Sequence, residues 1–246
     1  MSIPKIIHYC WFGGGAISPE NRKCMESWKK YCPDYKIMAW NEQNFDISPN
    51  RYAQQAYEAK RYAFVSDYVR LAVLYEYGGI YLDTDVELVR PLDELLELPG
   101  FMGFQTNNEV ATGLGFGARK GNSVVQALLR DYDALDFLKA DGSADLTPCP
   151  ERNTRVLQAL GVRKDGTRQS IAEMEIFPAE YFCPMDLYSR KLRVTPKTYS
   201  IHRYAESWKP KPSAVSRILQ RLLKKHYYTW YCPLRGRIEG RLRKRT

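Results

Sequence analysis

Two acidic residues, Asp83 and Asp85, directly follow an apolar run in the stretch GGIYLDTDVELVRPL, which spans residues 78–92. Because alternate residues of an extended segment share a face, both carboxylates can approach one cation. Two anions held this close repel each other unless a cation, a proton or several hydrogen-bond donors compensate them. Carboxylate oxygens suit the hard ions Mg²⁺ and Mn²⁺. The pattern predicts a divalent-metal site, with a solvated acidic loop as the alternative.

Three kinds of metal protein use such an acidic pair. An EF-hand loop starting at Asp83 needs glycine at its sixth position, where this chain has Leu88, so we exclude it. A phosphatase of the haloacid-dehalogenase type places two such aspartates after an apolar strand, which YLDTDV fits, with Asp83 as nucleophile. It also needs a later lysine and a further acidic pair, for which ADGSAD (140–145) is the candidate. In a nucleotide-sugar transferase, the metal bridges a diphosphate leaving group. Both enzymes stay open, as does a non-catalytic nucleotide- or lipid-binding module.

The segment before the acidic pair carries a second charged pair, Asp67 and Arg70. They are three residues apart, so they share one face of a helix. An exposed ion pair is the simplest interpretation. However, the neighbouring residues are apolar almost all round the helix, which is typical of a buried helix. A buried ion pair needs further partners, and a sugar hydroxyl and a phosphate would suit Asp67 and Arg70 respectively.

Single aromatic and histidine residues add weaker candidates. Trp11 ends an apolar run and precedes three glycines; it is either a core residue or a platform on which a base stacks. His202, in the stretch YSIHRYAESW, is either structural or a third metal ligand. We expect His8, inside an apolar run, to be structural and His226 to be solvated.

The segments around these residues predict an α/β fold. We expect a first helix over 18–32, with Ser18 as N-cap and Pro19 at its first position. Further helices are expected over 62–77, 122–135 and 151–161. Strands are expected over 4–12, 35–40, 80–88, 101–104 and 114–118, with short strands or loops over 175–185 and 198–204. In a parallel α/β sheet, ligands bind at the carboxyl ends of strands, which is where the acidic pair is expected.

The composition fits a single large domain with a substantial core, since the chain has 246 residues and 44% are apolar. No run of about 18 apolar residues predicts a membrane span, and the first residues do not resemble a signal peptide. The six cysteines show no CxxC spacing, so we expect reduced, buried thiols and a cytoplasmic protein.

Positive charge is concentrated at the carboxyl end. From residue 209 onward the chain carries twelve basic residues and one acid, Glu239, although the net charge of the whole chain is only +9. Apolar and aromatic residues recur at roughly helical spacing over 213–231. These features predict an amphipathic basic helix that binds an anionic membrane surface. We expect no nucleic-acid partner, because no reading module accompanies the charge.

Four stretches taken together resemble glycosyltransferases of the DXD sugar-binding group, family 32 in the carbohydrate-enzyme classification. That group includes bacterial capsular-polysaccharide transferases and the yeast initiating mannosyltransferase; the clostridial glucosylating toxins are more distant. The resemblance covers about residues 3–208 and is densest over 62–96. The stretches are IPKIIHYCWFGG, SWKKYCPDYKIMAWNEQNFD, YAFVSDYVRLAVLYEYGGIYLDTDVELVRPLDELL and IHRYAESW.

The resemblance implies a GT-A fold: one Rossmann-like α/β domain with a mixed sheet over 1–208, followed by the tail of 209–246. It implies a nucleotide-sugar donor, Mn²⁺ or Mg²⁺, and transfer of a hexose with retention to a surface glycan or lipid-linked acceptor. UDP is the expected nucleotide. The enzyme would lie in the cytoplasm at the inner face of the cell membrane.

The resemblance also assigns residues to the donor. Trp11 would stack on the base, and Tyr81 would lie near the nucleotide. Asp67 would bind sugar or ribose hydroxyls, and Arg70 would bind the sugar or the diphosphate. The segment from Asn107 to Gly115 would face the donor sugar and the acceptor.

The metal and diphosphate residues are implied in the same way. Asp85 would bind the metal directly, and Asp83 would meet the ribose and, through water, the metal. His202 would be the carboxyl-terminal metal ligand, with Ser207 and Trp208 at the diphosphate. Catalysis would then depend chiefly on three residues: Asp67, Arg70 and Asp85.

Overall fold

The structure, a computed structural model, describes residues 2–186 and 189–205. The basic tail and its expected helix over 213–231 lie outside these residues. The helices are α1 (Pro19–Tyr31), α2 (Arg51–Glu58), α3 (Tyr62–Tyr77), a 3-10 turn η1 (Asp93–Leu95), α4 (Ser123–Asp133), α5 (Cys149–Ala159) and α6 (Ala179–Phe182). The strands are β1 (Ile6–Cys10), β2 (Lys36–Trp40), β3 (Gly79–Tyr81), β4 (Val86–Leu88), β5 (Gly100–Phe104), β6 (Val110–Ala111), β7 (Phe116–Ala118), β8 (Gln169–Ile171), β9 (Met174–Phe177) and β10 (Ser200–His202).

Eight strands form one mixed sheet in the order β2-β1-β3-β7-β5-β9-β8, with β6 beside β5. Strands β2, β1 and β3 are parallel, β7 is antiparallel to β3 and β5, and β9 is parallel to β5. The carboxyl ends of β1, β3 and β5 therefore share one edge of the sheet, from which β7 starts. The predicted α/β class with a mixed sheet is confirmed.

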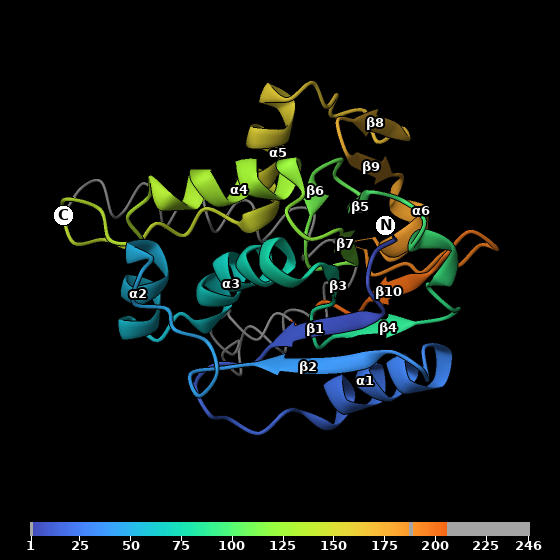
Figure 1. Cartoon of the computed structure of the whole chain (residues 1–246), viewed down its shortest axis with the longest axis horizontal. Helices are drawn as coiled ribbons and strands as arrows, with labels where there is room; N and C mark the ends of the chain where they lie inside the picture. The colour runs from blue at the N-terminus through green and yellow to red at the C-terminus, as the bar shows by residue number, and fades with distance from the viewer. Residues whose placement is uncertain (1, 187–188, 206–246) are drawn as a thin grey trace.

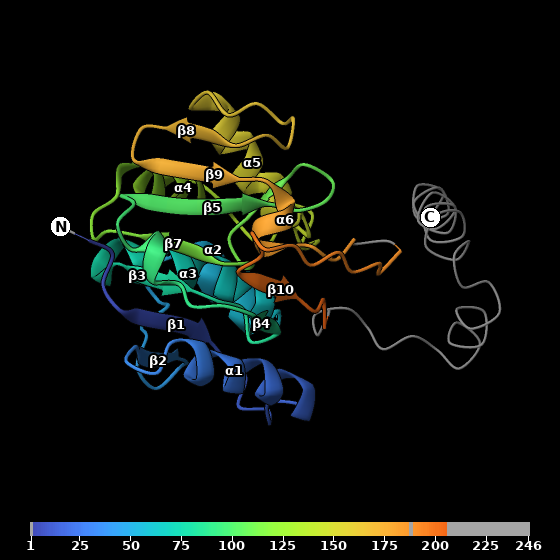
Figure 2. The same ribbon diagram turned by 90° about the vertical axis from the view of Figure 1, so that its right-hand side faces the viewer.

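The sheet separates two hydrophobic clusters, because alternate residues of a strand point to opposite faces. On β1, Cys10 joins the cluster that contains buried residues of α2, α3, α4 and α5. Ile7 of the same strand joins the other cluster, which contains residues of α1, α6 and the β4–β10 pair. Figures 1 and 2 show the two groups of helices on the two sides of the sheet.

Two of the predicted helices begin and end where the sequence indicated. The Ser18 side chain accepts a hydrogen bond from the amide of Asn21, and Pro19 starts α1. Helix α3 ends at Tyr77 and is capped by Gly78, whose φ of +65° lies in the left-handed region that favours glycine. Helix α2 was not predicted, although Asn50 caps it through the amide of Ala53. The short helix α6 was not predicted either.

The prediction of one strand over 80–88 was wrong. Strand β3 ends at Tyr81 in the large sheet, whereas β4 starts at Val86 and pairs with β10 in a separate two-stranded sheet. Between them the chain turns, closed by a hydrogen bond from the amide of Val86 to the carbonyl of Asp83 at 2.9 Å. The acidic pair therefore lies in a turn between two sheets, and the two residues do not share the face of one strand.

Candidate active site

The turn after β3 brings two carboxylates and an imidazole together. Strand β10 runs antiparallel to β4 and pairs His202 with Val86, which places the imidazole beside the acidic pair. His202 Nε2 lies 3.2 Å from Asp85 Oδ1 and 4.0 Å from Asp83 Oδ2. One possible ligand atom from each of these three residues lies within 4.8 Å of the others. The turn therefore brings both carboxylates close to one point, as predicted, although the two residues do not lie on an extended strand.

Each carboxylate is held by one oxygen and presents the other to His202. Asp83 Oδ1 accepts hydrogen bonds from Arg70 Nη2 at 3.1 Å and from the Tyr81 hydroxyl at 3.0 Å. Asp85 Oδ2 accepts from the backbone amide of Ala205 at 2.7 Å. The two remaining oxygens and the imidazole nitrogen converge. The two carboxylate oxygens fit Mn²⁺ or Mg²⁺, which prefer oxygen ligands, and His202 offers a nitrogen as a third ligand.

Helix α1 fixes the turn from its outer side. Asn21 donates to the Thr84 hydroxyl at 2.9 Å, and the Trp28 indole donates to the carbonyl of Val86 at 2.7 Å. The Ser27 hydroxyl accepts from the amide of Leu88 at 2.8 Å. The last two bonds satisfy backbone groups of β4. All three bonds tie the turn to α1.

The surroundings raise the pKa of Asp83 and lower the pKa of Asp85. Burial raises the pKa of Asp83, although the Arg70 guanidinium opposes this. Burial also opposes ionisation of Asp85, but His202 and the Ala205 amide hold its pKa down to about 2. Burial lowers the pKa of His202, yet the two carboxylates outweigh that effect and raise it. The raised pKa of His202 reflects the two carboxylates beside it, and Asp85 adds to the effect of burial on Asp83. A bound cation would offset this negative charge.

Arg70 connects the acidic turn to α3. The predicted ion pair is present and buried: Arg70 Nη2 lies 3.1 Å from Asp67 Oδ1, and the guanidinium lies over the Tyr81 ring at 4.8 Å. Arg70 Nε donates to the carbonyl of Ser66 at 3.1 Å. Burial, which Arg70 opposes, raises the pKa of Asp67 to about 6. Arg70 therefore holds both Asp67 and Asp83 in place.

The remaining Arg70 nitrogen faces Thr112, inside the segment expected to face the donor, and two residues of α5 that were not predicted, Cys149 and Asn153. Nη1 lies 3.4 Å from the Thr112 hydroxyl and 3.7 Å from Cys149 Sγ. Asn153 of α5 donates to both of these atoms, at 3.1 and 3.3 Å. The Asn153 Oδ1 atom is buried and has no hydrogen-bond partner among the described residues. No local pattern marks these residues, because β6 and α5 reach Arg70 only through the tertiary fold.

Gly113 lies against the acidic turn, inside the segment expected to face the donor. Its carbonyl accepts from the amide of Asp83 at 3.0 Å. A Cβ atom at this position would lie 1.9 Å from Asp83 Oδ2 and 3.3 Å from Arg70 Nη1. Only glycine therefore leaves room for the Asp83 carboxylate as it stands.

Other predicted residues lie at the same edge without touching the acidic turn. Trp11 follows β1 and is half-buried, and its indole donates to the carbonyl of Gly15. Asn107 follows β5, and its side chain contacts Glu109 at 3.0 Å. Among the described residues, no hydrogen bond or ion pair joins either side chain to the acidic pair. Ser207 and Trp208 lie outside the described residues.

His8 and the described cysteines are buried, as predicted. His8 is fully buried and structural: its Nε2 lies 2.8 Å from the carbonyl of Gly78, and its Nδ1 accepts from the Trp40 indole at 2.9 Å. The described cysteines are free and buried, at positions 10, 24, 32, 149 and 183. His226 lies outside the described residues.

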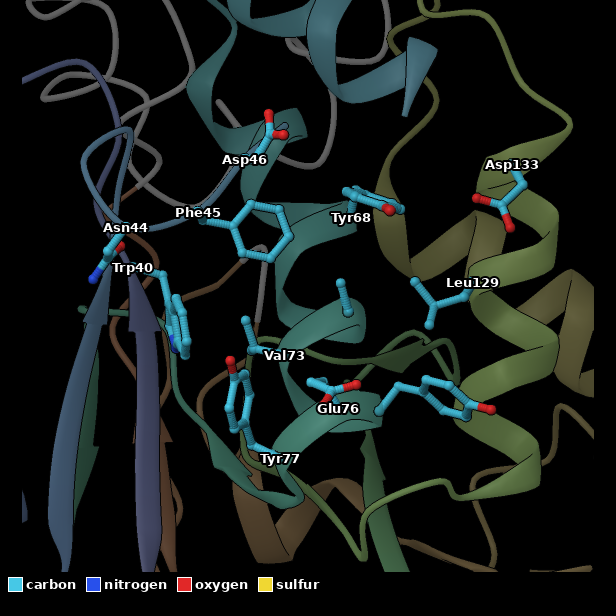
Figure 3. A pocket seen from close by; sticks show the side chains of 12 residues that line it. Trp40, Asn44, Phe45, Asp46, Tyr68, Val73, Glu76, Tyr77, Leu129 and Asp133 are labelled. Carbon is cyan, nitrogen blue, oxygen red and sulfur yellow. The ribbon is translucent and has the colours of Figure 1, made fainter. Parts of the chain in front are cut away.

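A separate groove of about 380 Å³ lies over the outward face of α3, between the loop after β2 and α4 (Figure 3). Four aromatic side chains form a chain of ring contacts along it, with centroids 5.3 to 6.5 Å apart. They are Tyr77, Trp40, Phe45 and Tyr68. Three acids, Asp46, Glu76 and Asp133, also line the groove. It shares no residue with the acidic turn.

Parts of the chain are similar in sequence to known glycosyltransferases. The family described as "Glycosyltransferase sugar-binding region containing DXD motif" matches residues 18–101, which include α1, α3 and the acidic turn. Inositol phosphoceramide mannosyltransferase 3 of Schizosaccharomyces pombe is 29% identical over 151 residues, which are 55% of this chain and 39% of the yeast protein. An uncharacterized glycosyltransferase of Acanthamoeba polyphaga mimivirus is 26% identical over 219 residues, 85% of this chain and 84% of the viral one.

Among solved structures, the PaToxG glycosyltransferase resembles the chain with a TM-score of 0.48 and 21% identity, over 64% of this chain and 70% of that one. No helix among the described residues has both the length and the apolar character needed to cross a bilayer.

Proposed function

We propose that this chain, a member of the glycosyltransferase family that contains the DXD sugar-binding region, transfers a hexose from a nucleotide sugar to a glycan or lipid-linked acceptor with retention at the anomeric carbon. The proposal includes a UDP-sugar as donor, Mn²⁺ or Mg²⁺ as cofactor, and a GT-A type domain. The observation that carries it is the convergence of Asp83 Oδ2, Asp85 Oδ1 and His202 Nε2.

The acidic turn and His202 would hold the cation. When bound, such a cation neutralises charge on a diphosphate leaving group. Despite burial, His202 and the Ala205 amide hold the pKa of Asp85 down to about 2, so this residue would meet the cation as a carboxylate. Asp83 is shared between Arg70 and the cation site, which suits a residue that also contacts the ribose.

Asp67 and Arg70 would orient the donor. Asp67 is almost completely buried, with 9% of its surface exposed, and it pairs with Arg70 at 3.1 Å. In the proposal its carboxylate also accepts a hydrogen bond from a donor hydroxyl. Arg70 Nε and Nη2 bind the protein at 3.1 Å, whereas the contacts of Nη1 are 3.4 and 3.7 Å long. In the proposal, Nη1 is therefore the nitrogen whose N–H groups donate to a sugar hydroxyl or a phosphate oxygen. Trp11 at the same edge would stack on the base.

Retention without a covalent intermediate fits the residues around Arg70. Cys149 contacts this residue, but burial raises the pKa of its thiol to about 12, so it stays a neutral, poor nucleophile. In the proposed step the acceptor oxygen bonds to the anomeric carbon on the face from which the diphosphate leaves. The bond from that carbon to the phosphate oxygen breaks, and this oxygen takes the acceptor proton. Preorganised charge stabilises the departing diphosphate.

The acceptor and the membrane are linked in the proposal. The name of the yeast relative includes a lipid, inositol phosphoceramide, which favours a lipid-linked acceptor. The twelve basic residues from 209 onward would bind anionic headgroups at the inner face of the cell membrane. Deleting 212–246 should release the protein from anionic liposomes in a sedimentation assay; unchanged co-sedimentation would overturn the anchor and leave the transferase proposal untouched.

One assay tests the transferase against its alternatives. The full chain is incubated with Mn²⁺ and a panel of nucleotide sugars, and nucleotide release is measured. Slow release from one UDP-sugar supports the proposal, and binding of UDP without turnover would overturn it in favour of a binding module. Phosphate released from simple monoesters would favour the phosphatase. In the structure the acids of ADGSAD are committed elsewhere, Asp141 to Ser143 and Asp145 to Arg152.

A further inference from the structure

A short backbone segment wraps around Asp85 after β10. We name residues 203–205 the Asp85 clamp. The amide of Arg203 donates to the backbone carbonyl of Asp85 at 2.9 Å, and the amide of Ala205 donates to its carboxylate Oδ2 at 2.7 Å. Two amides of the clamp thus bind the same residue, one through its backbone and one through its side chain. Because Oδ2 is tied to the clamp, the carboxylate cannot rotate freely, and Oδ1 stays beside His202.

The clamp depends on an unusual backbone conformation at Tyr204. Its φ is +52°, in the left-handed region that side chains other than glycine and asparagine rarely adopt. This conformation reverses the chain direction between Arg203 and Ala205, so that both amides point to Asp85. A tyrosine persists in such a strained position only when its surroundings over-determine it.

The Tyr204 side chain supplies these surroundings. Its hydroxyl lies 2.8 Å from Cys183 Sγ, and its ring meets the His202 imidazole edge to face with centroids 4.3 Å apart. The Arg190 guanidinium lies over the Tyr204 ring, 5.0 Å from its centroid. It also donates to the carbonyls of Arg203 and Tyr204 at 3.3 and 3.2 Å. Tyr204 is 8% exposed, so these contacts are shielded from solvent.

We propose that Tyr204 is a positioning residue for the cation site: its left-handed backbone aims the Ala205 amide at Asp85, and its ring orients His202. The inference rests on the proposed metal dependence. Groups that orient metal ligands from behind typically change metal affinity by 10- to 100-fold when removed. Tyr204 differs from most such groups because it acts on two ligands at once, on one through the backbone and on the other through the ring.

Mn²⁺ affinity of the full chain, measured by electron paramagnetic resonance of free Mn²⁺ without any donor, tests the proposal. Tyr204→Val disfavours the left-handed backbone and removes the ring, so we expect roughly 10- to 100-fold weaker binding. Tyr204→Gly tolerates the backbone and removes only the ring, so its loss should be smaller. Tyr204→Phe keeps both and should stay within a few-fold of the unaltered chain.

Lys60→Val is the matched control, because Lys60 also has a left-handed φ, of +55°, but lies at the end of α2. It should lower the melting temperature in EDTA and leave Mn²⁺ affinity unchanged. Equal affinities of the valine and glycine variants of Tyr204 would overturn the backbone role, and unchanged affinity in Tyr204→Val would overturn the inference altogether. Absence of Mn²⁺ binding by the unaltered chain would instead overturn the proposed metal site itself.

Should valine at 204 prevent folding, the hydroxyl anchor offers a second comparison. Cys183→Ser keeps a hydrogen-bonding atom near the Tyr204 hydroxyl, whereas Cys183→Ala removes it. Weaker Mn²⁺ binding in the alanine variant than in the serine variant supports the proposal, and equal binding contradicts it.

Discussion

Helix α3 presents two faces with opposite chemistry. Asp67 and Arg70 lie on one face, buried among charged and polar partners. On the other face Tyr68, Ala72 and Glu76 line the open groove shown in Figure 3. The sequence predicted a helix that is apolar almost all round and largely buried. The structure corrects this for the groove face, where Tyr68 and Ala72 are half-buried and Glu76 is exposed.

The acidic residues on the two faces of α3 differ in their exposure to solvent. Asp67 has 12% of its side chain exposed and pairs with Arg70, whose own side chain is 6% exposed. Glu76 pairs with Lys120 at 3.2 Å, but the two side chains are 61% and 66% exposed. Water screens the second pair and not the first. Replacing an acid by its amide should therefore have large effects at the buried site and small effects at the groove.

The largest effect is expected at Asp85. Asp85→Asn keeps the shape of the side chain but removes the negative charge that meets His202 at 3.2 Å. We expect donor turnover to fall by roughly 10³-fold, comparable to losing a group that stabilises transition-state charge. The measurement is nucleotide release with Mn²⁺ at saturating donor. Asp93→Asn, on an exposed 3-10 turn, is the control; equal losses in both variants would contradict the assignment.

Much of this buried face could be predicted from the sequence. The spacing of Asp67 and Arg70 on an apolar helix indicated a shared, buried face. The position of the acidic pair after an apolar strand indicated the carboxyl edge of the sheet. His202 followed from a resemblance, because nothing in the chemistry of one histidine distinguishes a ligand from a structural residue.

The partners of these residues could not be predicted, and the reason is physical. Cys149 and Thr112 reach Arg70 through the packing of α5 and β6, which no periodicity records. Ala205 contributes a backbone amide, a group that every residue but proline carries. The turn at Thr84 replaces an extended strand because α1 supplies hydrogen bonds from outside the segment. Each of these contacts joins segments that are distant in the sequence, so no local pattern marks it.

The effect of burying Asp67 on the free energy of unfolding can be measured through its pH dependence. Its pKa of about 6 in the folded chain exceeds the ordinary value of 3.8. The folded state therefore binds the proton more tightly than the unfolded state, so the native state loses stability as pH rises from about 4 through 6. Because Asp67→Asn cannot ionise, it should gain stability relative to the unaltered chain over this range, by about 3 kcal/mol.

The measurement is the free energy of unfolding in urea at pH 4 and pH 8, in EDTA, for both chains. Only the change of their difference with pH counts, because the lost Arg70 pair adds an offset at every pH. The same variant should lose donor turnover. A difference that does not change between the two pH values would contradict the buried, protonation-sensitive carboxylate.

Gly113 tests the space around Asp83. A Cβ at this position would lie 1.9 Å from Asp83 Oδ2, so Gly113→Ala should destabilise the fold by about 1–3 kcal/mol through overpacking. It should also weaken Mn²⁺ binding, because the carboxylate must move. The destabilisation should shrink in the Asp83→Ala background, where the clashing group is gone. Equal penalties in both backgrounds would locate the strain elsewhere than at Asp83.

The smallest effect is expected on the groove face. Glu76→Gln makes the same kind of change as Asp67→Asn on the same helix, but it breaks only the exposed pair with Lys120. The free energy of unfolding should change by about 0.5 kcal/mol or less, and donor turnover with a soluble acceptor should be unchanged. Added salt should reduce even this change, since it screens exposed pairs. A loss of turnover comparable to that of Asp67→Asn would mean that the groove communicates with the buried face through α3, and the two faces would then have to be treated as one site.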